Sequence, residues 1–180
     1  MKKLTFILGI CTFVFTIYSA YAQPASGYRN DGGQSQGYHS SQSQNRINWQ
    51  PTYNSAVAAS RTLSKPILIL FTGTHWCPAC MKLERDVLTK PEFARAVGDR
   101  LVFLKAEFPN YTADSIEASP FKFLLDRYKV DAFPTMIIIN PEGHVLFNVN
   151  YQTGGVEPYI QEITKQLSQF ENSNPNSNFY

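Results

Sequence analysis

The sequence is short of metal-binding side chains and of excess charge of either sign. Its 180 residues contain three cysteines, three histidines and 16 basic against 14 acidic side chains, a formal net charge of +2. This balance gives no electrostatic reason to bind nucleic acid or acidic lipid. A structural zinc site needs about four ligands, and the sequence offers no second cysteine pair, so we expect no such site.

The N-terminus has the layout of a secretory signal peptide. Two lysines precede an apolar run from Leu4 to about Tyr18, and the small residues of "AYA" end at Ala22. A basic start, an apolar core and a small-x-small site are typical of a cleaved signal. We therefore expect residues 1–22 to be removed on export to the periplasm; a retained membrane anchor is the alternative.

Cleavage would leave Cys77 and Cys80 as the only cysteines, because Cys11 lies in the signal segment. An oxidising compartment would let this pair form a disulfide, but closing so short a loop would stabilise the fold only weakly. The pair is therefore expected to do redox chemistry or to bind a soft metal. A copper(I) metallochaperone using both thiols and His75 is one alternative, and a non-catalytic binding module is another.

Composition divides the rest of the chain. Residues 23–46 are rich in Ser, Gln, Gly and Asn and lack the aliphatic side chains needed for a core, so they read as a flexible linker. Residues 171–180, "ENSNPNSNFY", are expected to form a disordered tail. A single folded domain is expected between them, at residues 47–170.

Within this domain, strand patterns alternate with helix patterns. Continuous apolar or β-branched runs predict strands, and apolar spacing of three to four residues predicts helices. The predicted strands are at 67–71, 100–108, 135–140 and 144–151, and the predicted helices are at 51–64, 77–89, 90–98, 119–130 and from 156 to the domain end. This order predicts an α/β fold with a central mixed sheet and helices on both faces.

The two cysteines lie where the first buried strand gives way to a helix, in "THWCPAC". Cys77 is expected near the helix N-cap, where free backbone N–H groups and the helix dipole favour its thiolate. Pro78 suits the first helical turn because it needs no N–H partner there. Cys80 lies three residues on, on the same face, so Cys77 is expected to be the nucleophile and Cys80 the resolving thiol.

Together, "KPILILFTGTHWCPAC", "AFPT" and the "PEG" turn resemble the thioredoxin superfamily. The resemblance implies a thioredoxin fold and thiol:disulfide oxidoreductase activity. It further implies that Pro134 is cis and lies against the cysteine pair. The backbone of Phe133 and the ring of Trp76 would then help to dock an extended substrate.

The chain departs from the usual thioredoxin pattern in the strand beneath the cysteines. Thioredoxins carry an acid there that helps to move a proton of the resolving thiol, whereas this chain has Leu70 or Phe71. Lys105 and Glu107 are the candidates for a substitute proton relay, and a solvent-facing pair at a strand end is the alternative.

The dipeptide between the cysteines also differs, with Pro78 and Ala79 in place of Gly-Pro. These two residues are expected to tune the redox potential, and the uncharged Ala79 favours a more reducing couple than a protonated histidine would. His75 would favour the Cys77 thiolate if it were protonated nearby; a surface histidine is the alternative.

The chain as a whole is similar to the small periplasmic thioredoxin-like proteins of the Dsb type, in particular the chlamydial DsbH group. This resemblance implies a monomeric reductase of disulfides in exported proteins, which receives electrons from a membrane donor of the DsbD type. It implies no organic cofactor and no metal. A periplasmic oxidase or isomerase remains an alternative, because the direction of electron flow depends on small differences in thiolate stability.

Overall fold

The computed structural model describes residues 45–173 and contains a five-stranded sheet. The expected signal peptide (1–22) lies outside the described residues, as do most of the expected linker (23–46) and tail (171–180). The strand order is β1-β3-β2-β4-β5. The strands are β1 (Trp49–Gln50), β2 (Ile67–Thr72), β3 (Val102–Glu107), β4 (Thr135–Ile139) and β5 (Val145–Val149).

The sheet is mixed, as the sequence predicted. β1, β3 and β2 run parallel, β4 is antiparallel to β2, and β5 is antiparallel to β4. The β4–β5 hairpin turns at Gly143, whose φ of 84° is a left-handed conformation that favours glycine. The Gly143 N–H donates to the carbonyl of Asn140 at 2.9 Å and closes the turn.

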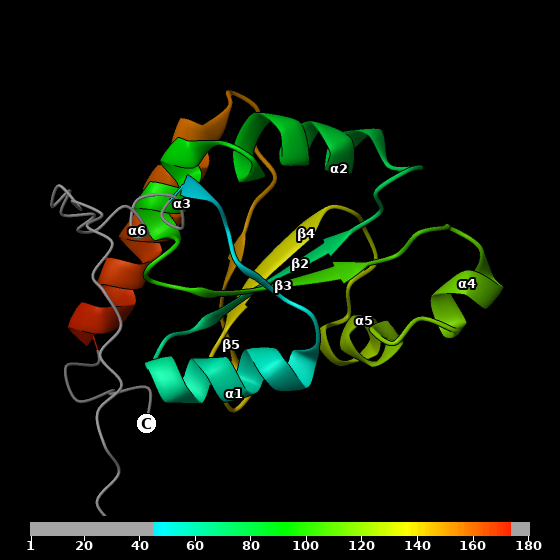
Figure 1. Cartoon of the computed structure of the whole chain (residues 1–180), viewed down its shortest axis with the longest axis horizontal. Coiled ribbons are helices and arrows are strands. Elements are labelled where there is room, and N and C mark those ends of the chain that lie inside the picture. The colour runs from blue at the N-terminus through cyan, green and yellow to red at the C-terminus, as the bar shows by residue number, and fades with distance from the viewer. Residues whose placement is uncertain (1–44, 174–180) are drawn as a thin grey trace, which may run out of the picture. The chain divides into compact units, whose positions relative to one another are not determined.

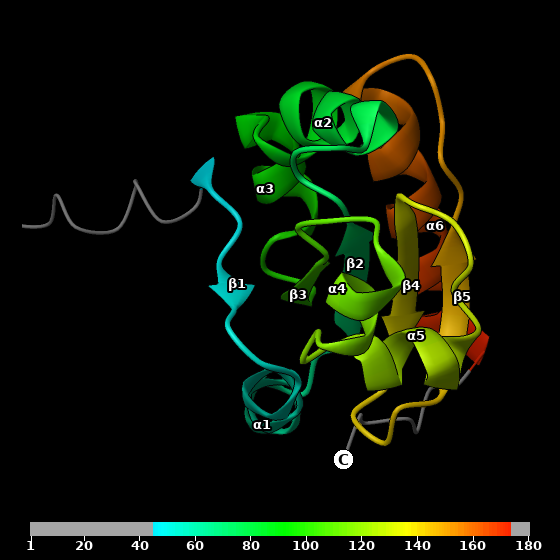
Figure 2. The same ribbon diagram turned by 90° about the vertical axis from the view of Figure 1, so that its right-hand side faces the viewer.

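Helices cover both faces of the sheet (Figures 1 and 2). One face carries α1 (Tyr53–Leu63), α4 (Ala113–Glu117) and α5 (Lys122–Tyr128). The other carries α2 (Pro78–Leu83), the π-helix η2 (Glu84–Leu88), α3 (Pro91–Val97) and α6 (Val156–Ser173). Among residues 45–173, no helix is both long enough and apolar enough to cross a membrane.

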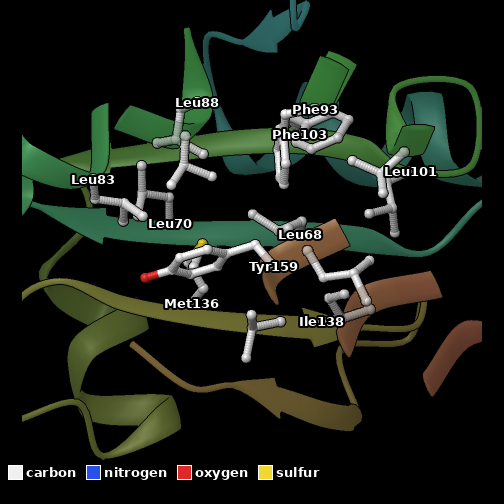
Figure 3. Close-up of a cluster of buried hydrophobic side chains, with 14 of the residues drawn as sticks. Leu68, Leu70, Leu83, Leu88, Phe93, Leu101, Phe103, Met136, Ile138 and Tyr159 are labelled. Carbon is white, nitrogen blue, oxygen red and sulfur yellow. The ribbon is translucent and has the colours of Figure 1, made fainter. Parts of the chain in front are cut away.

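Strand β2 runs through the middle of the core, and all six of its residues are buried. Leu68 and Leu70 face the α2, α3 and α6 side, where they join the cluster drawn in Figure 3. Ile69 and Phe71 face the α1 and α5 side. Burial on both faces explains why this strand is continuously apolar instead of alternating.

Several elements differ from the sequence prediction. Strand β1 and helix α4 were not predicted, and α6 continues to Ser173, beyond the predicted domain end at residue 170. The predicted helix at 119–130 begins only at Lys122. Ser119 and Pro120 therefore precede its first turn, although the Ser119 hydroxyl does accept the N–H of Phe121 at 3.2 Å.

Candidate active site

The two cysteines form a disulfide at the head of α2. Cys77 is the N-cap residue, and its Sγ accepts the backbone N–H of Cys80 at 3.2 Å. Pro78 occupies the first helical turn, as predicted. Cys77 and Cys80 are only 5% and 3% exposed. A partner protein that reaches the disulfide must therefore also contact the residues around it.

The segment that leads into β4 lies against Cys77. The carbonyl oxygen of Phe133 is 3.8 Å from Cys77 Sγ, and the Phe133–Pro134 peptide bond is cis. The fold thus brings a peptide carbonyl from the start of β4 next to the sulfur at the start of α2.

Aromatic rings pack together beside the cysteine motif, on Trp76, which precedes Cys77, and on Phe133. The Trp76 Nε1–H donates to the carbonyl of Phe108 at 2.8 Å, and the Trp76 and Phe133 rings meet edge to face with centroids 5.5 Å apart. Tyr111, from the loop before α4, lies 4.8 Å from the Trp76 ring centroid although it is 63% exposed. We call Trp76, Tyr111 and Phe133 the aromatic surface. The sequence suggested Trp76 and Phe133 as docking residues, and it gave no sign that Tyr111 would lie beside Trp76.

The surroundings of Leu70 on the α2 side of the sheet are apolar. Leu70 is 1% exposed and lies in one cluster with Leu83 and Met136 (Figure 3). Phe71 belongs to the cluster on the opposite face, so Leu70 is the residue on the α2 side. In the described part of the chain, the buried polar or charged residues are Ser60 and Thr72, and neither is an acid.

A pocket of about 490 Å³ opens beside α2, and Cys80 is one of its lining residues. Lys105 and Glu107, the predicted relay candidates, also line it. Lys105 Nζ lies 2.8 Å from Glu84 Oε2, and the hydroxyl of Thr74 donates to Glu107. Glu84 was missed from the sequence, where nothing distinguishes it from an ordinary solvent-facing helix residue.

His75 is exposed in the loop that precedes Cys77. Over residues 45–173, no group of three or more His, Cys, Asp or Glu side chains is arranged to hold a metal ion. A copper(I) site with three ligands from Cys77, Cys80 and His75 therefore gains no support from the geometry of these residues.

Comparison with known proteins identifies the family. The family model described as thioredoxin-like matches residues 48–141, which is more than half of the chain. The chain belongs to the thioredoxin-like family. The thioredoxin fold inferred from "WCPAC" and "AFPT" is thereby confirmed, together with its mixed sheet.

Two curated relatives of this thioredoxin-like chain come from Chlamydia pneumoniae. The disulfide bond reductase DsbH is 30% identical over 122 residues, covering 67% of this chain and 73% of DsbH. The thioredoxin-related protein DsbJ is 27% identical over 105 residues, covering 57% of this chain. The match spans only 30% of DsbJ, so DsbJ as a whole is a much longer protein.

Solved structures agree with this assignment. A DsbH oxidoreductase superposes with a TM-score of 0.61 at 25% identity, covering 76% of this chain and 95% of that one. A thioredoxin from Thermus thermophilus gives a TM-score of 0.55 at 18% identity, covering 73% and 93%. The resemblance to the DsbH group inferred from the sequence is therefore confirmed.

Proposed function

We propose that this protein is an exported thiol:disulfide oxidoreductase that reduces disulfide bonds of other exported proteins in the periplasm. The observation that carries the proposal is the Cys77–Cys80 disulfide at the head of α2, with Cys77 Sγ 3.8 Å from the Phe133 carbonyl. The reductive direction is supported by the similarity to a protein named disulfide bond reductase. The layout of residues 1–22 supports export through a cleaved signal peptide.

The reaction takes two exchange steps. The Cys77 thiolate attacks a substrate disulfide, which gives a mixed disulfide and releases one substrate thiolate to take up a proton. Cys80 then loses its proton and attacks Cys77 Sγ, which releases the second substrate thiolate and closes the Cys77–Cys80 bond. The substrate gains two electrons and two protons. A membrane donor of the DsbD type would return the two electrons.

The other site residues act around this exchange. Trp76, Phe133 and Pro134 would dock an extended substrate at Cys77, with the Phe133 backbone offering hydrogen bonds as in an added strand. Pro78 and Ala79, between the cysteines, would set the redox potential through the shape and N–H groups around Cys77 Sγ.

From the sequence, Lys105 and Glu107 are the predicted candidates for a proton relay to Cys80. Their support is that both line the pocket to which Cys80 contributes. No organic cofactor takes part in the proposed cycle.

The test is reduction of insulin disulfides by the purified protein in the presence of dithiothreitol. We expect turnover by the wild type, none by Cys77→Ser, and a trapped mixed disulfide with Cys80→Ser. Activity that survives Cys77→Ser would exclude the redox assignment.

The direction of electron flow is tested by the redox state of the pair in cells, trapped with acid and an alkylating reagent. A mostly reduced pair supports the reductase, and a mostly oxidised pair would favour an oxidase.

A further inference from the structure

The second exchange step needs a proton acceptor, and this need rests on the function proposed above. Cys80 must become a thiolate before it can attack Cys77 Sγ, and burial disfavours the charged form of a thiol. Cys80 is 3% exposed, and its Sγ lies 3.5 Å from the Gly73 backbone nitrogen. Leu70, the β2 residue at the position where thioredoxins carry an acid, cannot accept a proton. The acceptor must therefore lie on another side of Cys80.

The pocket beside α2 is a place where such an acceptor can lie. Cys80 lines it together with four charged side chains, Glu84, Arg85, Lys105 and Glu107. They come from η2, which follows α2 directly, and from the end of β3, so charged groups from both neighbouring elements face the same space as the thiol.

Two of the four charged groups are bound elsewhere. The Arg85 Nε donates to Asp86 at 2.8 Å, and the same carboxylate also accepts a hydrogen bond from Lys82. The carboxylate of Glu107 accepts the hydroxyl of Thr74 in the loop before the cysteines. Arg85 lies in η2 and Glu107 at the end of β3, and the hydrogen bonds of both side chains go to groups other than Cys80.

Glu84 is the acid that the helix directs to Cys80. It follows Cys80 by four residues, and side chains at this spacing are neighbours on a helix surface, with β-carbons about 5–6 Å apart. Lys105 Nζ holds its Oε2 at 2.8 Å from across the pocket. Lys105 is itself fixed by the Trp49 ring, whose centroid lies 4.8 Å from Nζ.

The backbone also changes at Glu84. The helix turns from α to π at this residue, and the Glu84 N–H donates to the carbonyls of both Cys80 and Met81. Short π segments inside helices occur often at functional sites, because they re-aim the side chains that follow. Here the change of pitch occurs at the acid that shares the pocket with Cys80.

We propose that Glu84 accepts the proton of Cys80, through water in the pocket, when Cys80 attacks the mixed disulfide. Lys105 acts as a positioning residue that holds the Glu84 carboxylate at the pocket through their 2.8 Å ion pair. The proton passes from Cys80 Sγ to Glu84 and then to solvent, while the electron pair of Cys80 forms the new bond to Cys77. In this proposal, Glu84 on the helix takes the role in proton transfer that an acid in the strand has in thioredoxins.

The test measures the two exchange steps separately as a function of pH. Single-turnover mixing of the reduced protein with an excess of a disulfide peptide gives both rates, and Cys80→Ser isolates the first. We expect Glu84→Gln to slow the second step about tenfold at pH 7 and to leave the first unchanged. Tenfold is below the range of about 10²–10⁴ for general bases, because a thiol ionises partly by itself near neutral pH.

The pH profile distinguishes proton transfer from a structural role. In the wild type, the second rate should level off at a lower pH than in Glu84→Gln, where it should keep rising with hydroxide. Lys105→Met should move the profile in the same direction by less. Glu92→Gln, an exposed acid of α3 paired with Arg95 at 3.9 Å, is the matched control and should keep the wild-type profile.

Three outcomes would overturn the assignment of Glu84. The first is an unchanged profile in Glu84→Gln, and the second is a shift in Glu107→Gln alone. The third is an equal loss in both steps of Glu84→Gln, which would indicate a distorted site. A wild type that cannot reduce the peptide at all would instead reject the proposed function.

Discussion

A β-carbon added at Gly73 would lie 2.4 Å from the indole ring of Trp76. The ring therefore lies directly against the backbone of residue 73, at the point where β2 has just ended. The same Gly73 N–H donates to Cys80 Sγ at 3.5 Å. The Trp76 ring and the Cys80 sulfur thus both approach the backbone of Gly73.

Gly73→Ala should displace Trp76 and weaken substrate docking. The added methyl group has no room beside the ring, and overpacking of this kind costs about 1–3 kcal/mol of unfolding free energy. Trp76 would lose its hydrogen bond to the Phe108 carbonyl and its contact with Tyr111. We expect KM for a disulfide peptide to rise several-fold, measured together with chemical unfolding.

A double-mutant cycle identifies the cause of this loss. If the methyl group acts by striking the indole, Gly73→Ala should cost little in a Trp76→Ala background, because the ring is already gone. Equal costs in the two backgrounds would instead point to the backbone of residue 73 or to its contact with Cys80.

Tyr111→Ala should weaken the binding of substrates that carry an aromatic residue beside the cysteine. A well-packed aromatic pair contributes about 0.5–1.5 kcal/mol beyond its buried area, which corresponds to a rise of about two- to tenfold in KM. Tyr111→Phe should retain most of the affinity. Phe123→Ala removes a ring of 48% exposure that packs on Tyr53, and it serves as the control. An equal loss for peptides without an aromatic residue would contradict this assignment.

Asp86 should titrate well below an ordinary aspartate. The hydrogen bond from Arg85, and then that from Lys82, lower the pKa of Asp86 to about 2. Because the folded pKa is depressed, the stabilisation is present above the ordinary value of 3.8 and is lost as the pH falls through about 2. NMR titration of the carboxyl group should show this midpoint. Arg85→Gln should raise it more than Lys82→Gln does, and the reverse order would contradict the assignment.

The core strands and the cysteine motif could be predicted because each carries a local signal. The run from Ile67 to Phe71 is continuously apolar since the strand is buried on both faces. "WCPAC" places two thiols and a first-turn proline at a helix start, and the structure has this arrangement. These features depend on neighbours in the sequence, so the sequence alone reveals them.

The parts that escaped prediction depend on contacts between distant segments. Strand β1 has only two residues, which is too short to show any periodicity. Tyr111 looks like an ordinary loop residue until the fold brings it to Trp76. Glu84 looks like a solvent-facing helix residue until β3 brings Lys105 to its carboxylate. Contacts between residues this far apart in the sequence cannot be predicted from a local sequence pattern.

Leu70→Asp would place an acid at the β2 position where thioredoxins carry one, and we expect it to destabilise the fold. Leu70 lies in an apolar cluster with Leu83 and Met136, and burying an unpaired polar group costs about 1–3 kcal/mol or more. Leu70→Met conserves volume and should cost less than about 1.5 kcal/mol. Chemical unfolding of both variants at pH 7 measures the difference.

The pH dependence of that difference shows whether the cost comes from charge. Burial raises the folded-state pKa of the introduced carboxyl group above its unfolded value of about 3.9. The charge penalty is then absent below pH 3.9, grows as the pH rises through the folded pKa, and is constant above it. A Leu70→Asp variant equally unstable at pH 4 and pH 8 would instead owe its loss to packing. A variant that stays fully stable would mean that the apolar cluster does not exclude an acid from this position.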